Sequence, residues 1–72
     1  MDSLEARFGK ILHRIRKEKK FTQEALAIDC GLDRTYISLL ERGLRQPTLG
    51  TLFKIAEVLK VSPSSMVKEL EK

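Results

Sequence analysis

Residues Gln23 to Arg42 read QEALAIDCGLDRTYISLLER. This stretch contains two short segments with apolar residues at helical spacing, joined by Gly31. A glycine at that point permits the left-handed backbone that ends a helix and turns the chain tightly. Two helices joined in this way cross at about 90–120°. The apolar seam that such a crossing needs is present at Leu26, Ala27, Cys30, Leu32, Ile37 and Leu40.

The second of the two segments begins with polar residues that no core requires. Asp33 is a good N-cap residue, and Arg34 and Thr35 follow it. An arginine pairs with guanine O6 and N7, and a threonine offers a hydroxyl or a methyl group to a base. A helix held at a fixed angle with such side chains at its start is typical of DNA reading. The side chains that we expect to contact DNA are Gln23, Arg34, Thr35, Tyr36, Ser38, Arg42, Arg45 and Gln46.

Some of these assignments have a second interpretation. Tyr36 either contacts the DNA or packs its ring on the surface of the domain. Arg45 and Gln46 either brace the DNA backbone or are solvated loop residues. Gln23 lies near the positive end of its helix, which favours a phosphate oxygen.

The rest of the chain also has helical spacing, so we predict an all-α fold with five helices. The first has Asp2 and Glu5 as a capping box, and the fourth has Leu49, Leu52, Phe53, Ala56 and Leu59 as its apolar face. In the fifth, Met66, Val67 and Leu70 either close the core or form a dimer face. The expected ranges are about 4–19, 23–30 after Thr22, 34–42 after Asp33, 49–60 after Thr48, and 63–71 after Ser62.

Size and composition narrow the possibilities further. The 72 residues form one small domain, in which we place the helix-turn-helix at about 23–42. Charged residues make up 33% of the chain, which excludes a membrane protein, and the net charge of +4 suits nucleic acid or an anionic surface. A solvated helix face would explain the charge equally well. No apolar run at the N-terminus has signal-peptide length, so we expect a cytoplasmic protein.

The inventory of reactive residues argues against an enzyme. His13 is the only histidine and Cys30 the only cysteine, and there is no glycine-rich phosphate loop. We therefore expect no metal site, no cofactor and no small-molecule ligand. Cys30 falls on the apolar seam and is expected to be a small buried hydrophobe.

Beyond these patterns, the chain resembles the Xre family of bacterial and phage regulators, which includes phage Cro and repressor proteins. The strings that carry the resemblance are FTQEALAIDCGLDRTYISLLERG, QPTLGTLFKIAEVL and VSPSSMV. LDRTYIS followed by ER resembles in particular the controller proteins of restriction–modification systems. The resemblance implies a compact five-helix, lambda-repressor-like domain. It also implies a homodimer whose third helix enters the major groove of a pseudo-palindromic operator.

The resemblance also implies roles for individual residues. Gln23 matches a glutamine that contacts the DNA backbone, and Arg34 and Thr35 match the pair that reads bases. Arg16 and Glu41 match a buried salt bridge between the first and third helices. Leu39 departs from the pattern, because some phage repressors have a base-reading glutamine there. Some of Met66, Val67 and Leu70 are implied at the dimer interface.

We therefore expect a transcriptional regulator that binds specific DNA as a homodimer, with a restriction–modification controller as the narrower hypothesis. A protein-interaction module, such as an antitoxin-like partner that uses the same fold, is the alternative.

Overall fold

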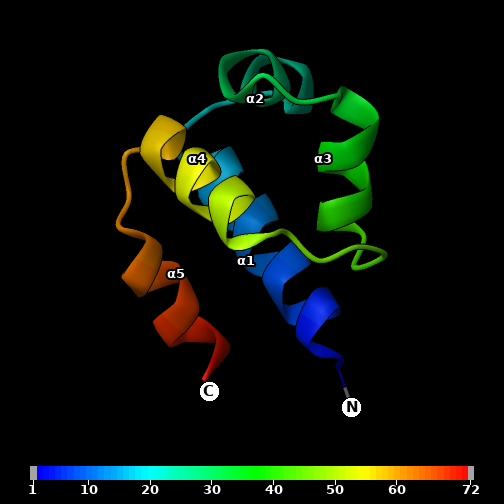
Figure 1. Ribbon diagram of the computed structural model, residues 1–72, viewed down its shortest axis with the longest axis vertical. Helices are drawn as coiled ribbons and strands as arrows, with labels where there is room; N and C mark the ends of the chain where they lie inside the picture. Colours follow the sequence, from blue (N-terminus) through cyan, green and yellow to red (C-terminus); the bar gives the residue numbers. More distant parts are fainter. Residues whose placement is uncertain (1, 72) are drawn as a thin grey trace.

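The computed structural model describes residues 2–71, and these form five helices and no strand (Figure 1). The prediction of an all-α, five-helix fold is confirmed, and each helix ends within about one residue of its expected limit. The helices are α1 (Leu4–Glu18), α2 (Gln23–Cys30), α3 (Arg34–Glu41), α4 (Leu49–Leu59) and α5 (Pro63–Leu70).

Local capping explains why most helix starts were predictable. The hydroxyls of Thr22, Thr48 and Ser62 each accept a hydrogen bond from the backbone N–H three residues later, at 3.0–3.1 Å. Asp33 precedes α3 with extended backbone angles, but its side chain makes no capping bond.

The predicted capping box at the start of α1 is wrong. Ser3 is the N-cap, and its hydroxyl accepts from the backbone N–H of Ala6 at 3.1 Å. Asp2 instead forms an ion pair with Lys10, at 2.6 Å. A serine and an aspartate next to each other are both good caps, so the sequence alone does not decide between them.

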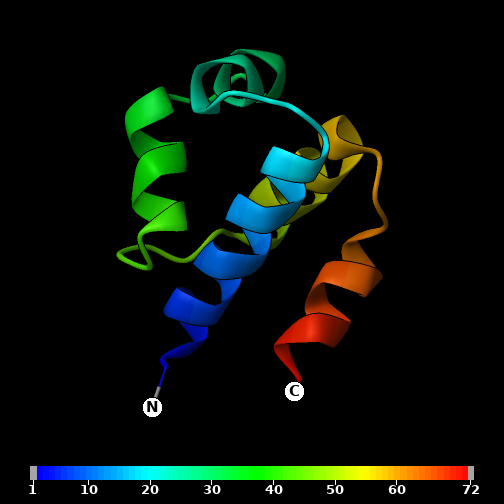
Figure 2. The same cartoon turned by 180° about the vertical axis from the view of Figure 1, so that it is seen from behind.

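Helix α1 lies at the centre of the fold, with α3 on one side of it and α5 on the other (Figure 2). Helix α2 crosses one end of the molecule and packs on α3 and α4. The largest fully buried side chains come from all five helices, which therefore share one core. They are Leu12, Leu26, Ile37, Leu40, Ile55, Leu59 and Met66.

The predicted apolar face of α4 is partly wrong. Leu49 is 76% exposed and Phe53 is 59% exposed, whereas Ile55 is fully buried. Two overlapping sets of apolar residues in this segment both have the spacing of a helix face. Only the packing of α4 against α2 and α5 determines that the set with Ile55 is buried. Leu49 and Phe53, four residues apart, are left on an exposed face of α4.

Helices α1 and α3 approach each other closely at Gly9, which the sequence analysis did not single out. A Cβ atom on Gly9 would lie 2.5 Å from the carbonyl oxygen of Glu41 and 2.6 Å from that of Leu40. Only glycine allows the two backbones to come this near. The contact sets the position of α3 relative to the rest of the domain.

Candidate DNA-binding surface

The turn between α2 and α3 has the predicted form. Gly31 adopts left-handed angles, φ 70° and ψ 31°, and the N–H of Leu32 donates to the carbonyl of Ala27 at 2.8 Å. Ala27 and Ile37 are buried at the crossing, as the seam requires. Cys30 is buried beside them, and that burial raises the pKa of its thiol. The glycine turn and this buried seam therefore set the angle at which α3 crosses α2.

The first turn of α3 presents its polar side chains to solvent. Arg34 and Thr35 are exposed, and so are Arg42 and Arg45 beyond the far end of the helix. Ser38 is half-buried on the helix between them. These side chains give α3 and its far end an exposed surface of basic and hydroxyl groups that takes no part in the core.

Two predicted contact residues, Tyr36 and Gln46, make contacts with other parts of the protein. Tyr36 is half-buried and packs against the core, which matches the second interpretation given for it. Gln46 is exposed, but a hydrogen bond from its amide to Glu5 lowers the pKa of that carboxyl. Gln46 also lines a groove of about 190 Å³ with residues of α1, α4 and α5.

The predicted ion pair between α1 and α3 is present. Arg16 Nε donates to Glu41 Oε2 at 2.5 Å, and Arg16 Nη2 donates to Glu41 Oε1 at 3.1 Å. The two side chains are 8% and 4% exposed. Arg16 Nη1 also donates to the carbonyl of Phe21 at 2.7 Å, so this buried guanidinium ties three segments together.

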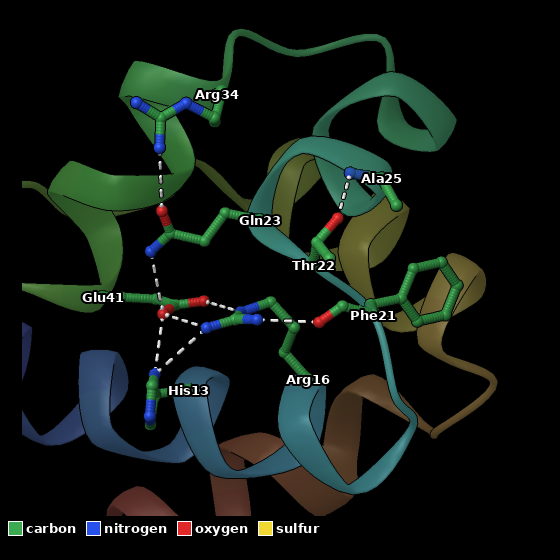
Figure 3. Close-up of polar contacts among 8 residues, drawn as sticks. All are labelled: His13, Arg16, Phe21, Thr22, Gln23, Ala25, Arg34 and Glu41. Carbon is green, nitrogen blue, oxygen red and sulfur yellow. Dashed lines mark hydrogen bonds and ion pairs between the residues drawn. The ribbon is translucent and has the colours of Figure 1, made fainter.

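Two further side chains converge on Glu41, and sequence reasoning assigned neither of them this role. Nδ1 of His13 lies 2.9 Å from Glu41 Oε1, and Nε2 of Gln23 donates to the same oxygen at 3.2 Å (Figure 3). His13 is three residues before Arg16, so both face the same side of α1, and that spacing is the signal that could have revealed it. The role of Gln23 depends on the α2–α3 crossing and leaves no local signal.

The carboxyl of Glu41 is held in its charged form. Burial alone would raise its pKa, but hydrogen bonds from Arg16, His13 and Gln23 outweigh that effect and bring the pKa below its ordinary value. A charged carboxylate with this many donors is a rigid anchor at the base of α3.

Gln23 also reaches the exposed end of α3. Its side-chain amide oxygen, Oε1, accepts a hydrogen bond from Arg34 Nη1 at 3.4 Å. Contacts therefore run from α1 through Glu41 and Gln23 to Arg34, as Figure 3 shows.

A shallow basic cleft of about 470 Å³ lies beside this network. It is formed by the end of α1 and the starts of α2 and α3, and Lys17 and Lys20 line it together with Arg34. The cleft adjoins the N-terminus of α2, where backbone N–H groups favour an anion. A shape of this kind suits a phosphate group of a nucleic acid.

Other kinds of site find no support in the described part of the chain. Among residues 2–71, no three His, Cys, Asp or Glu side chains are grouped so that they could hold a metal ion. Within the same range, no helix has the length and apolar character needed to cross a membrane.

Comparison with known proteins agrees with this geometry. A helix-turn-helix family model, HTH_3, matches residues 12–65. The control protein C.MunI of Mycoplasma sp is 40% identical over 73 residues, which span 100% of this chain and 99% of that protein. The control protein C.BamHI of Bacillus amyloliquefaciens is 43% identical over 61 residues, covering 83% of this chain and 75% of that protein.

A solved structure shows the same fold. The restriction-modification controller protein C.AhdI from Aeromonas hydrophila superimposes with a TM-score of 0.83 and 37% identity, over 86% of this chain and 94% of that one. The predicted resemblance to the Xre family, and within it to controller proteins, is confirmed by these matches. The chain belongs to the Xre-type helix-turn-helix family of DNA-binding transcriptional regulators.

Proposed function

We propose that this chain binds a pseudo-palindromic operator as a homodimer and controls the genes of a restriction–modification system. The observation that carries the proposal is the exposed start of α3, with Arg34 and Thr35 presented by a helix that a buried ion pair anchors to α1. A helix-turn-helix places side chains at this position against base edges in the major groove.

The proposed contacts divide into two kinds. Arg34 and Thr35 select bases, while Gln23, Arg42 and Arg45 contact the phosphate backbone on either side of α3. Ser38 faces the groove from the middle of the helix. Tyr36 and Gln46 take part only at the edge of the contact: the ring of Tyr36 packs against the core, and Gln46 bonds to Glu5 of α1.

Leu39 adds no polar contact to this surface. It is half-buried on α3, and an apolar side chain there offers a base only van der Waals contact, for instance to a thymine methyl group. The proposed specificity therefore rests on few residues. Additional affinity comes from Lys17 and Lys20 at the basic cleft, which makes binding dependent on salt.

The proposed dimer uses the apolar surface that the core leaves uncovered. Met66 is fully buried and belongs to the core, so we leave it out of the interface. Val67 remains 40% exposed, and Leu70 lines the groove beside α1 and α4. With Leu49 and Phe53 of α4, they offer apolar area to a second copy of the chain.

A homodimer sets a geometric expectation for the operator. The two copies of α3 would enter successive major grooves about 34 Å apart, so the half-sites would be centred one helical turn from each other. The restriction–modification assignment is supported by the named controller relatives. A controller of this kind would activate at low dose and repress at high dose in the cytoplasm.

Selection of bound duplexes from a random DNA pool, with the footprint recorded, tests the proposal. We expect a two-fold symmetric site with half-sites one turn apart and strong loss of binding as salt rises. A restriction or methyltransferase gene beside the coding sequence would support the narrower assignment, and its absence would count against it. If no duplex is retarded at low salt and a stable complex with another protein is recovered, the interaction-module alternative is favoured.

A further inference from the structure

Gln23 occupies an unusual position between a buried charge and an exposed one. Its amide nitrogen donates to Glu41 Oε1 at 3.2 Å, and its amide oxygen accepts from Arg34 Nη1 at 3.4 Å. Figure 3 shows the three side chains in this order, from the base of α3 to its exposed start. One side chain of α2 thus connects the two ends of α3.

The chemistry of the partners dictates which way the amide faces. A carboxylate only accepts hydrogen bonds and a guanidinium only donates them. The reverse orientation would place the amide oxygen against the Glu41 carboxylate and the NH2 group against the Arg34 guanidinium, which are two repulsive contacts. The charge on Glu41 therefore determines that an acceptor is presented to Arg34.

The anchor of this arrangement does not move easily. Glu41 is 4% exposed and is held by two bonds from Arg16. Nδ1 of His13 lies against the same oxygen that Gln23 contacts. Each of these contacts restricts the position of Oε1, and hence the position of the amide that donates to it.

Arg34 needs such help because, within residues 2–71, Gln23 is its one side-chain hydrogen-bond partner. It is exposed on the first turn of α3, and a long arginine side chain loses considerable rotamer freedom when it is held in one place. A binding group that is already ordered in the free protein loses less of that freedom on contact with its target. The geometry also explains why Glu41, which lies two helical turns from Arg34, can affect it: seven residues bring a side chain back to the same helix face.

From these contacts we infer that Glu41 is a positioning residue for DNA specificity, which acts through Gln23 to pre-order the Arg34 guanidinium over the DNA-facing surface. The inference rests on the proposed function. It adds to the structural role of Glu41 in the ion pair with Arg16. Since the Gln23–Arg34 bond is long, at 3.4 Å, the expected effect on base preference is about fivefold, as for a single modest hydrogen bond.

The first test uses the free protein and needs no DNA. In Gln23→Met, which keeps the length of the side chain but removes both hydrogen bonds, the NMR order parameter of the Arg34 Nε–H bond should fall. It should fall similarly in Glu41→Gln, whose neutral side chain no longer dictates the amide orientation. Asp29→Asn, a neutralising change on an exposed part of α2 away from this cleft, is the control and should leave Arg34 as ordered as before. Arg34 as mobile in the parent protein as the loop residue Arg45 would overturn the inference.

The second test measures base preference with duplexes from the selected pool, at the position that loses preference in Arg34→Ala. Gln23→Met should reduce that preference about fivefold in the parent protein and should not reduce it further when Arg34 is alanine. A Gln23 that only contacts phosphate would weaken all sequences equally and would do so in both backgrounds, which would overturn the inference.

The two tests separate failure of the inference from failure of the proposed function. Should Glu41→Gln fail to fold, as judged by circular dichroism, Glu41→Asp takes its place, because it keeps the charge but draws the carboxylate back from Gln23. Arg34 should again lose order, and unchanged order would overturn the role of Glu41. Absence of any complex between the parent protein and DNA would overturn the proposed function, and with it the role in specificity. If Arg34 still lost order in the variants, that result would show only that the side chains of Glu41, Gln23 and Arg34 are linked in the free protein.

Discussion

Replacing Gly9 with alanine tests the close approach of α1 and α3, which positions the DNA-facing helix. The new Cβ would lie 2.5 Å and 2.6 Å from two backbone carbonyl oxygens of α3, whereas ordinary contacts begin at 3.4 Å. Because the obstructing atoms are backbone, no flexible side chain can swing away. The helices would have to separate by most of an ångström, against the core packing and the Arg16–Glu41 ion pair.

The size of the effect follows from two opposing contributions. Overpacking a well-packed core costs about 1–3 kcal/mol, and the rigid carbonyls place this site near the upper end. Alanine recovers about 1 kcal/mol over glycine in a helix interior. We therefore expect Gly9→Ala to lower the free energy of unfolding by about 2 kcal/mol, which corresponds to a Tm about 8–16 °C lower in a domain of this size.

The chain offers a matched control for this substitution. Gly50 lies in the first turn of α4, and the nearest atom to its added Cβ is Thr48 Oγ1, at 3.8 Å. Gly50→Ala should therefore stabilise the protein by about 0.5–1 kcal/mol. Urea unfolding followed by circular dichroism, at one protein concentration, measures both variants. A Gly9→Ala protein as stable as the parent would show that α1 and α3 do not approach each other this closely.

Three further predictions concern the ion pair and the exposed apolar face. Because the pKa of Glu41 is lowered on folding, its contribution to stability is present above its ordinary pKa of 4.5 and is lost as pH falls through the folded value. In acid titration, the free energy of unfolding should therefore fall less steeply in Glu41→Gln than in the parent, and equal slopes would contradict this. Arg16→Met should lower the free energy of unfolding, measured in urea, by about 3–5 kcal/mol because it leaves the buried Glu41 carboxylate without its arginine partner. A loss below about 1 kcal/mol would show that water reaches Glu41. Phe53→Lys should leave the monomer fold intact but shift sedimentation towards the monomer, with the adjacent exposed Lys54→Ala as a control; an unchanged dimer would place the interface elsewhere.

The parts of the fold that the sequence predicts are those with local causes. Helices begin where a threonine hydroxyl accepts a hydrogen bond from the backbone N–H three residues later, as at Thr22 and Thr48. The α2–α3 turn likewise follows from the left-handed angles of Gly31. The pairing of Arg16 with Glu41 was implied by resemblance to a family, since the residues lie 25 positions apart and no local pattern joins them.

The features that the sequence did not predict depend on how helices pack. Ile55 and Phe53 both fit a helical apolar stripe, and only the neighbouring helices decide that Ile55 is inside. The roles of Gly9 and of His13 likewise arise where α1 meets α3. The link from Gln23 to Arg34 needs the angle between α2 and α3, so it becomes visible only in three dimensions.

Arg34→Ala tests whether the start of α3 reads DNA bases. Binding of the parent and the variant is compared on a selected site and on random duplex, at the same salt concentration. We predict a loss of about 1–3 kcal/mol on the selected site, relaxed preference at one base position, and little change on random duplex. An equal loss on both DNAs would show that Arg34 contacts only phosphate, and would contradict base reading by α3.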